Sequence, residues 1–179
     1  MTHDIITSER LLIRPITTND TDAIHEYAGD KSITMMTYIP KETKADTEDF
    51  VSYAVAEWNK AFPGDREYVI VYEGIIVGGI NLEHRHSTAV YEIGWIIRKD
   101  YRCKGIATEA ATALIEYAFN TLSASKVMSH CDSANSASER VMQKLGMTLT
   151  DNTKTRFYPK TGITSGELQY EITREEYYR

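Results

Sequence analysis

The clearest hydrophobic pattern in the chain is an alternation over residues 89–97, which predicts a strand. The odd-numbered positions from Tyr91 to Ile97 are apolar and share one face, whereas Glu92, Gly94 and Ile96 lie on the other face. After Gly105 the spacing changes, and apolar residues recur every three or four positions as far as Ala118. That period is typical of a helix, so the pattern predicts a strand, a short loop and a helix in succession.

Two further helices are indicated nearer the N-terminus. Asn19 with Asp22 is similar to a capping pair for a helix that ends at Ala28, before Gly29. Asp46 or Thr47 is expected to cap the next helix. The apolar positions of that helix are expected to form a core stripe: Phe50, Val51, Ala54, Val55, Trp58 and Phe62.

The remaining patterns complete an order of elements written βααβββαβαββ. Strands are expected at residues 10–16, 67–72, 75–82, 89–97, 126–131, 148–157 and 167–173, and a last helix at residues 135–145. The unit spanning residues 89–131 is expected to pair its two strands in parallel. The order therefore predicts a mixed α/β domain over residues 1–179, with a mostly antiparallel seven-stranded sheet flanked by four helices.

Composition narrows the class of protein. The 179 residues carry a formal net charge of −6, which argues against nucleic acid as a partner and is compatible with a cationic acceptor. No run of about 18 apolar residues is present, and the N-terminus does not read as a signal peptide, so we expect no membrane span and a cytoplasmic protein. The two cysteines, Cys103 and Cys131, have no metal-site spacing, and we expect no metal.

The loop after the 89–97 strand carries the most specific chemistry. Arg102-x-x-Gly105-x-Ala107 places small residues and cations before a helix start, where backbone N–H groups and the helix dipole favour an anion. It is not a P-loop, because Lys104 precedes Gly105 and no Lys-Ser/Thr follows it, and the dinucleotide pattern G-x-G-x-x-G is absent. The loop predicts a phosphate or pyrophosphate site, with a solvated basic turn as the alternative.

The chain resembles the GNAT acetyltransferase superfamily over nearly its whole length. Glu92-Ile-Gly-Trp95 is similar to the family's fourth strand, and Arg102-x-x-Gly105-x-Ala107 to its acyl-CoA pyrophosphate loop. Asn135-x-x-Ser138-x-Arg140 and the two chain ends resemble the branch that includes ribosomal-protein N-terminal acetyltransferases. The resemblance implies a GNAT-like fold and acetyl-CoA as co-substrate, and it only suggests the acceptor.

The resemblance also implies where acetyl-CoA binds. In this family the fourth and fifth strands splay apart, and the pantetheine arm lies in the gap against the fourth strand's backbone, here Ile96, Ile97 and Arg98. A strand-four N–H near Trp95–Ile97 is expected to polarise the thioester carbonyl. The implied cofactor-binding set is completed by Arg102, Cys103, Lys104, Gly105, Ile106, Ala107, Thr108, Asn135 and Ser138.

Catalytic roles are assigned on the same basis. Glu92 is the first candidate for the base that takes a proton from the acceptor ammonium, with His130 or water as alternatives. Ser138 lies where related enzymes place a hydroxyl near the departing sulfur, and the early turns of its helix carry no Tyr, so Ser138 or water must protonate the thiolate. Helix capping alone, without any contact to a cofactor, would also account for Asn135 and Ser138 at these positions.

Other candidates rank lower. His84 and His86 lie near an expected turn and are expected to be exposed. An acylated Cys103 or Cys131 is disfavoured, because no activating base is evident nearby in the sequence.

The expected activity is transfer of acetyl from acetyl-CoA to a primary amine by direct attack, in a monomer or homodimer. The acceptor is a protein N-terminal α-amine or a small amine, in a pocket built from residues 35–44 and 156–166. A non-catalytic acyl-CoA sensor and an unrelated phosphate-binding domain remain as alternatives.

Overall fold

The computed structural model describes residues 5–36, 40–85 and 89–179. Its strands form a mixed sheet in the order β1-β2-β3-β4-β5-β6-β9-β7, with β8 paired to β9. Only β5 and β6 pair in parallel among the described strands, so the sheet is mostly antiparallel, as predicted. The strands are β1 (Ile6–Thr7), β2 (Leu11–Pro15), β3 (Asp65–Tyr72), β4 (Ile75–His84), β5 (Val90–Ile97), β6 (Lys126–Asp132), β7 (Thr148–Asp151), β8 (Thr155–Tyr158) and β9 (Ile163–Thr173).

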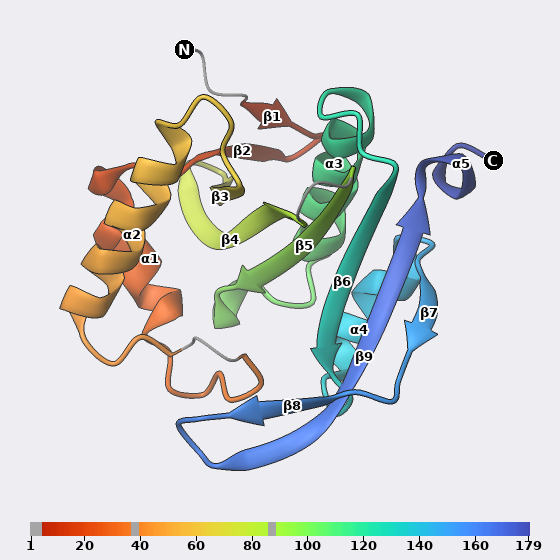
Figure 1. The fold of residues 1–179 in the computed structure, drawn as a ribbon. Coiled ribbons are helices and arrows are strands. Elements are labelled where there is room, and N and C mark those ends of the chain that lie inside the picture. Colours follow the sequence, from red (N-terminus) through yellow and green to blue (C-terminus); the bar gives the residue numbers. More distant parts are fainter. Residues whose placement is uncertain (1–4, 37–39, 86–88) are drawn as a thin grey trace.

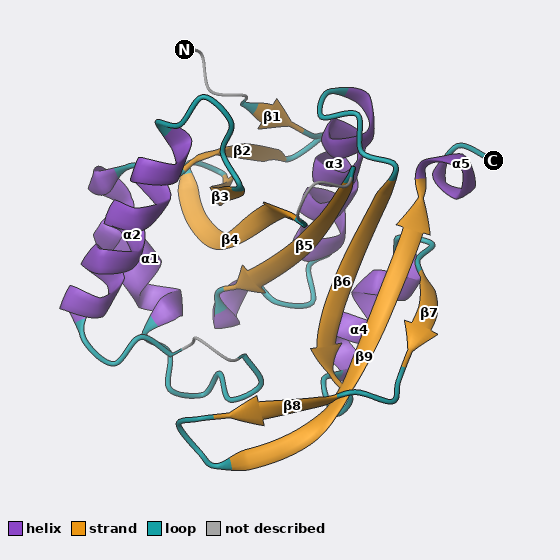
Figure 2. Ribbon diagram, viewed as in Figure 1, coloured by secondary structure: helices purple, strands orange, loops and turns teal. Residues whose placement is uncertain are grey.

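Helices cover both faces of this sheet (Figures 1 and 2). One face packs against α3, where Leu114 and Ile115 meet Ile93 in a fully buried core. The other face packs against α1 and α2 through a second cluster that contains Ile24 and Val51. The α-helices are α1 (Thr21–Ala28), α2 (Lys44–Trp58), α3 (Ile106–Asn120), α4 (Ser136–Lys144) and α5 (Arg174–Tyr177).

The strand and helix counts exceed the expected seven and four for local reasons. The predicted strand over residues 148–157 is two strands, because the Asp151 carboxylate accepts hydrogen bonds from the backbone N–H and hydroxyl of Thr153, each at 2.8 Å. This side-chain turn breaks the strand between β7 and β8. The two-residue β1 and the one-turn α5 are too short to give a periodic signal.

The helix starts also differ from the predicted ones. A capping box joins Thr17 and Asp20 ahead of α1, rather than Asn19 and Asp22. Thr43 caps α2 by accepting from the backbone N–H of Asp46 at 3.2 Å. Because α2 ends at Trp58, Phe62 lies beyond the helix and is 90% exposed instead of belonging to the core stripe.

The parallel pair β5 and β6 separates partway along its length. Its ladder pairs Val90 with Lys126, Tyr91 with Val127 and Glu92 with Met128, and then stops. At the next residue the hydroxyl of Ser129 donates to the carbonyl of Ile93 at 2.8 Å, in place of a strand bond. The two ribbons diverge from there (Figure 1), so the second half of β5 has no strand partner on its β6 side.

Candidate acyl-CoA site

The loop between β5 and α3 has the backbone geometry of an anion site. Gly105 is the N-cap of α3 with a left-handed φ of 79°, a conformation that favours glycine, and Cys103 has φ 61°. The N–H groups of Ile106, Ala107 and Thr108 belong to the first turn of α3, so they have no acceptor within the helix. The helix dipole adds partial positive charge at this point.

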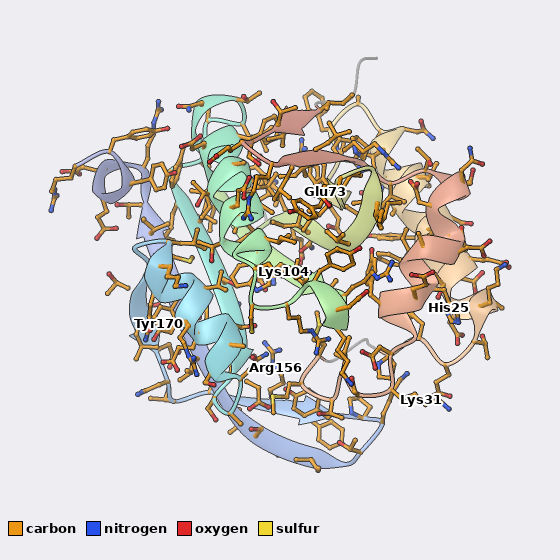
Figure 3. All side chains as sticks on the ribbon, turned by 180° about the vertical axis from the view of Figure 1, so that it is seen from behind. His25, Lys31, Glu73, Lys104, Arg156 and Tyr170 are labelled. Carbon is orange, nitrogen blue, oxygen red and sulfur yellow. The ribbon has the colours of Figure 1, made fainter. Side chains whose placement is uncertain are left out.

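Cations surround this loop. The Arg102 guanidinium donates from Nε to the carbonyl of Ile97 at 3.0 Å. Lys104 Nζ lies 4.8 Å from the centre of the Tyr101 ring, and Figure 3 shows Lys104 between the end of β5 and α3. Arg102 and Lys104 are partly or fully exposed, so both can reach an anion seated on the loop.

Arg10 is a further cation at this loop, and the sequence did not single it out. It comes from the turn before β2, and its guanidinium donates to the carbonyl of Lys104 at 3.2 Å. An ion pair with Glu109, in the first turn of α3, holds it there at 2.7 Å. Only the tertiary fold brings residue 10 to residue 104, so no local pattern could have identified it.

Hydrogen bonds show which backbone groups of β5 face the gap. The N–H of Arg98 donates to the carbonyl of Val77 at 2.8 Å, and the N–H of Arg85 donates to that of Val90 at 2.9 Å. Antiparallel pairing alternates, so the even-numbered residues of β5, Ile96 included, direct their backbone groups to β4. The groups on the open edge therefore belong to Trp95 and Ile97, rather than to Ile96 and Arg98.

The start of α4 forms the other wall of the site. The Asn135 side-chain oxygen accepts from the backbone N–H of Ser138 at 3.1 Å, so Asn135 caps α4. The Asn135 amide NH₂ and the Ser138 hydroxyl have no hydrogen-bond partner among the described residues, and both residues are half-buried. Capping therefore leaves both groups able to bind a ligand.

Glu92 and His130 meet across the point where β5 and β6 separate. His130 Nδ1 lies 3.2 Å from Glu92 Oε1, and Arg85 Nε donates to Glu92 Oε2 at 2.8 Å. His130 Nε2 contacts the amide oxygen of Gln169 at 3.0 Å. Both carboxylate oxygens of Glu92 and both ring nitrogens of His130 therefore have partners.

These contacts set the charges of the pair. Burial raises the pKa of Glu92, but hydrogen bonds from His130 and Arg85 outweigh it, and the net effect holds the pKa below its ordinary value. The hydrogen bond to Glu92 raises the pKa of His130, against a smaller effect of burial. The pair is an imidazolium–carboxylate over a broader pH range than the isolated groups would allow.

Three acidic residues that the sequence did not single out lie on the same face as Glu92. In the sheet register Asp65, Glu83 and Glu92 stand opposite one another, and Glu67 lies one pleat further along β3. Burial raises the pKa of Asp65 to about 6 and holds that of Glu67 well above its ordinary value. The alternation in β3 could have indicated this shared face, but not the partners of each carboxylate.

The two segments expected to build the acceptor pocket do meet. The Tyr158 hydroxyl lies 3.2 Å from the carbonyl of Met35 and donates to Asp132 Oδ2 at 2.7 Å. Lys160 pairs with Glu42 at 3.3 Å. Residues 37–39 of this expected pocket lie outside the described residues, and so does His86.

The remaining candidates have weaker support. Cys131 is buried, and burial raises the pKa of its thiol to about 11, which keeps it protonated and a poor nucleophile. Cys103 is exposed on the loop, and His84 is half-buried with its ring 5.0 Å from that of Tyr91. Among the residues described, no group of His, Cys, Asp or Glu could hold a metal ion. None of the described helices has the length and apolar character needed to cross a bilayer.

Comparison with known proteins gives consistent matches. A family model described as acetyltransferase (GNAT) domain matches residues 10–148. The uncharacterized N-acetyltransferase YnaD of Bacillus subtilis (strain 168) is 33% identical over 174 residues, 96% of this chain and 98% of its own length. The spermidine N(1)-acetyltransferase of Escherichia coli is 25% identical over 82% of this chain and 77% of its own length.

Solved structures agree on the fold. RimL, a ribosomal alpha-N-protein acetyltransferase in complex with coenzyme A, matches with a TM-score of 0.85, covering 95% of this chain and 98% of that one. Its sequence identity is 17%, so this likeness shows the fold alone.

Proposed function

Because the chain belongs to the GNAT acetyltransferase family, whose members transfer acetyl groups from acetyl-CoA, we propose that it acetylates the primary amine of a small cationic acceptor. The family match removes the unrelated phosphate-binding domain from the alternatives. The observation that carries the choice of acceptor is the acidic face beside the open edge of β5, formed by Asp65, Glu67, Glu83 and Glu92. One domain, residues 1–179, holds both halves of this site.

The chain's own groups fit acetyl-CoA along a continuous path. The N–H groups from Cys103 to Thr108, with Arg102 and Lys104, hold the pyrophosphate. The open edge of Trp95 and Ile97 pairs with the amide groups of the pantetheine arm, as an added strand would. The free amide NH₂ of Asn135 and the hydroxyl of Ser138 lie at the far side of the gap, where the sulfur ends. Acetyl-CoA, when bound, supplies the activated acetyl group.

The same residues promote the transfer itself. The Trp95 N–H is aimed into the gap and donates to the thioester oxygen as negative charge develops there. Glu92, held in place by His130 and Arg85, binds the acceptor ammonium beside that edge, directly or through water. Ser138 or a water that it holds donates a proton to the thiolate.

Relatives leave two acceptor classes to compare. The E. coli relative is a spermidine acetyltransferase, and RimL acts on a protein α-amine. The acidic face favours the polycationic small amine, because its negative potential attracts ammonium groups. The free thiols of Cys103 and Cys131 suit a reducing compartment, and we place the activity in the cytoplasm.

The test is a turnover assay with the purified protein and acetyl-CoA. Polyamines, an aminoglycoside, free amino acids and peptides with free N-termini are supplied in turn, and released CoA and acetylated product are measured. We expect the highest kcat/KM with a polyamine, falling as ionic strength rises. Highest turnover with a peptide would assign a protein N-terminus instead. Acetyl-CoA binding without turnover on any amine would identify a sensor.

A further inference from the structure

Glu67 differs from the other carboxylates on the acidic face in having no side-chain partner among the described residues. Asp65 accepts from the amide of Asn81 at 3.4 Å, Glu83 pairs with Arg85 at 2.9 Å, and Glu92 is held by Arg85 and His130. The Glu67 carboxylate makes no hydrogen bond or ion pair within the part of the chain that the structure describes. Glu67 is half-buried, so this carboxylate can still meet water or a ligand.

Glu67 lies on the same sheet face as Gly94, next to the open edge of β5 where the transfer is proposed to occur. Glu67, Asn81 and Gly94 are direct neighbours across β3, β4 and β5 and share one face of the sheet. Gly94 precedes Trp95, whose N–H faces the gap, and a Cβ at residue 94 would lie 2.8 Å from the Asn81 side-chain oxygen. The Asn81 amide therefore covers Gly94, whose Cα lies about 10 Å from the Glu67 Cα at two strand spacings. A Glu side chain and one bound water span that distance.

From this placement we propose that Glu67 is the proton acceptor for the acceptor ammonium, a role that rests on the function proposed above. The ammonium nitrogen gives one proton to the Glu67 carboxylate, directly or through water, and becomes a neutral amine. Its lone pair forms the C–N bond at the thioester carbon, the C–S bond breaks, and its electron pair leaves on sulfur. The new nitrogen loses a second proton, the thiolate takes one, and Glu67 returns its proton to solvent.

The surroundings of Glu67 suit that role better than those of Glu92 do. Burial is the largest influence on its pKa and raises it, and neighbouring carboxylates raise it further. The charged and titratable groups that act on it or respond to it come from β3, β4, α1, α2 and the loop before α2: Asp65, Glu83, Tyr27, Tyr53 and Lys41. Lys41 alone among them favours the charged carboxylate. A carboxylate with a raised pKa binds a proton more strongly and is a better base than Glu92, whose partners hold its pKa below the ordinary value.

The experiment compares Glu67→Gln and Glu67→Asp with wild type on the best acceptor, from pH 6 to 10. The matched control is Glu73→Gln, at the exposed turn that ends the same strand, six residues after Glu67 (Figure 3). We expect Glu67→Gln to lower kcat at least about tenfold at pH 7, with a deficit that shrinks as the amine loses its own proton at high pH. Glu67→Asp should recover part of the rate, and the Kd for acetyl-CoA should stay within about twofold for all variants.

Two outcomes overturn the assignment, and they are distinct. If wild type turns over and Glu67→Gln follows the same pH profile, at full rate or scaled by a constant factor, Glu67 does not accept the proton. If wild type binds acetyl-CoA but acetylates no amine, the proposed function has failed, and the role of Glu67 fails with it.

Discussion

His130 Nδ1 lies 3.2 Å from Glu92 Oε1, and this contact joins β5 to β6 at the last rung of their ladder. The two strands separate immediately beyond it, so the pair stands at the inner end of the gap. A charged pair placed there ties the two strands together beside the acidic face of the sheet. The predictions below test the pair and the groups around it.

Glu92→Gln is expected to lower kcat roughly 10²-fold at neutral pH, because the acceptor ammonium loses the carboxylate that positions it for attack. The Kd for acetyl-CoA should change little, since no part of the anion loop touches Glu92. The pKa of His130 should fall, because the hydrogen bond that its ring donates to Glu92 is the largest cause of its elevation. Steady-state kinetics, calorimetry and an NMR titration of the His130 ring measure the three effects. An unchanged His130 titration would show that the pair does not form in solution.

The stability contributed by this pair should depend on pH in a defined way. The raised pKa of His130 gives stability that is complete below its ordinary value of 6.5 and is lost as pH rises through the folded value. The lowered pKa of Glu92 gives stability that is complete above 4.5 and is lost as pH falls through the folded value. Urea unfolding of Glu92→Gln, His130→Gln and the double variant should therefore give the largest coupling energy between these two pH values. A coupling energy that did not vary from pH 4 to 9 would contradict an ion pair.

Gly105→Asp should weaken acetyl-CoA binding by at least about tenfold, because it places a carboxylate and a Cβ where the pyrophosphate must lie. Gly74→Asp is the matched control, since Gly74 has the same φ of 79° and open space around it in the β3–β4 turn. Both variants place an Asp at the same left-handed φ, so the difference in Kd between them reports on the anion site. Calorimetry on variants with native circular dichroism gives the result. Equal Kd values for the two would remove the loop from the acyl-CoA site.

The sequence predicted the anion loop more completely than the acceptor face, and the reason is physical. Gly105 and the start of α3 are specified by neighbouring residues, so a motif describes them. The partners of Glu92 come from residues 85 and 130, and the isolation of Glu67 depends on what α2 and β4 leave unpaired. The cap of α2 was predicted at the wrong residue for a simpler reason. Thr43, Asp46 and Thr47 all have side chains that can cap a helix, and the sequence does not show at which of them the chain turns into the helix.

Asn135→Ala and Ser138→Ala should separate two roles at the start of α4. Asn135→Ala removes the cap that accepts from Ser138 N–H, which typically costs about 1 kcal/mol, and should also weaken acetyl-CoA binding. Ser138→Ala keeps the cap and should lower kcat about tenfold, less than Glu92→Gln, since a thiolate is already a fair leaving group. Thermal unfolding and kinetics with saturating acceptor measure both. Loss of turnover in Ser138→Ala, with affinity and Tm unchanged in Asn135→Ala, would reverse these assignments.

Glu67→Gln should stabilise the fold at neutral and alkaline pH while it slows the reaction. A carboxyl whose pKa is raised on folding, from an ordinary value of 4.5, holds its proton more tightly in the native state. The native state therefore loses stability relative to the unfolded chain as pH rises from 4.5 through the folded value, and a neutral Gln removes that loss. Each kcal/mol recovered should raise Tm by about 2–4 °C for a chain of this size.

Thermal unfolding at pH 4 and pH 8 tests this prediction for Glu67→Gln, with Glu73→Gln as control. We expect the Tm of Glu67→Gln to exceed that of wild type at pH 8 and to match it at pH 4. A lower Tm at pH 8 would show that a partner stabilises the Glu67 carboxylate in the folded protein, and such a carboxylate would not be available to accept a proton.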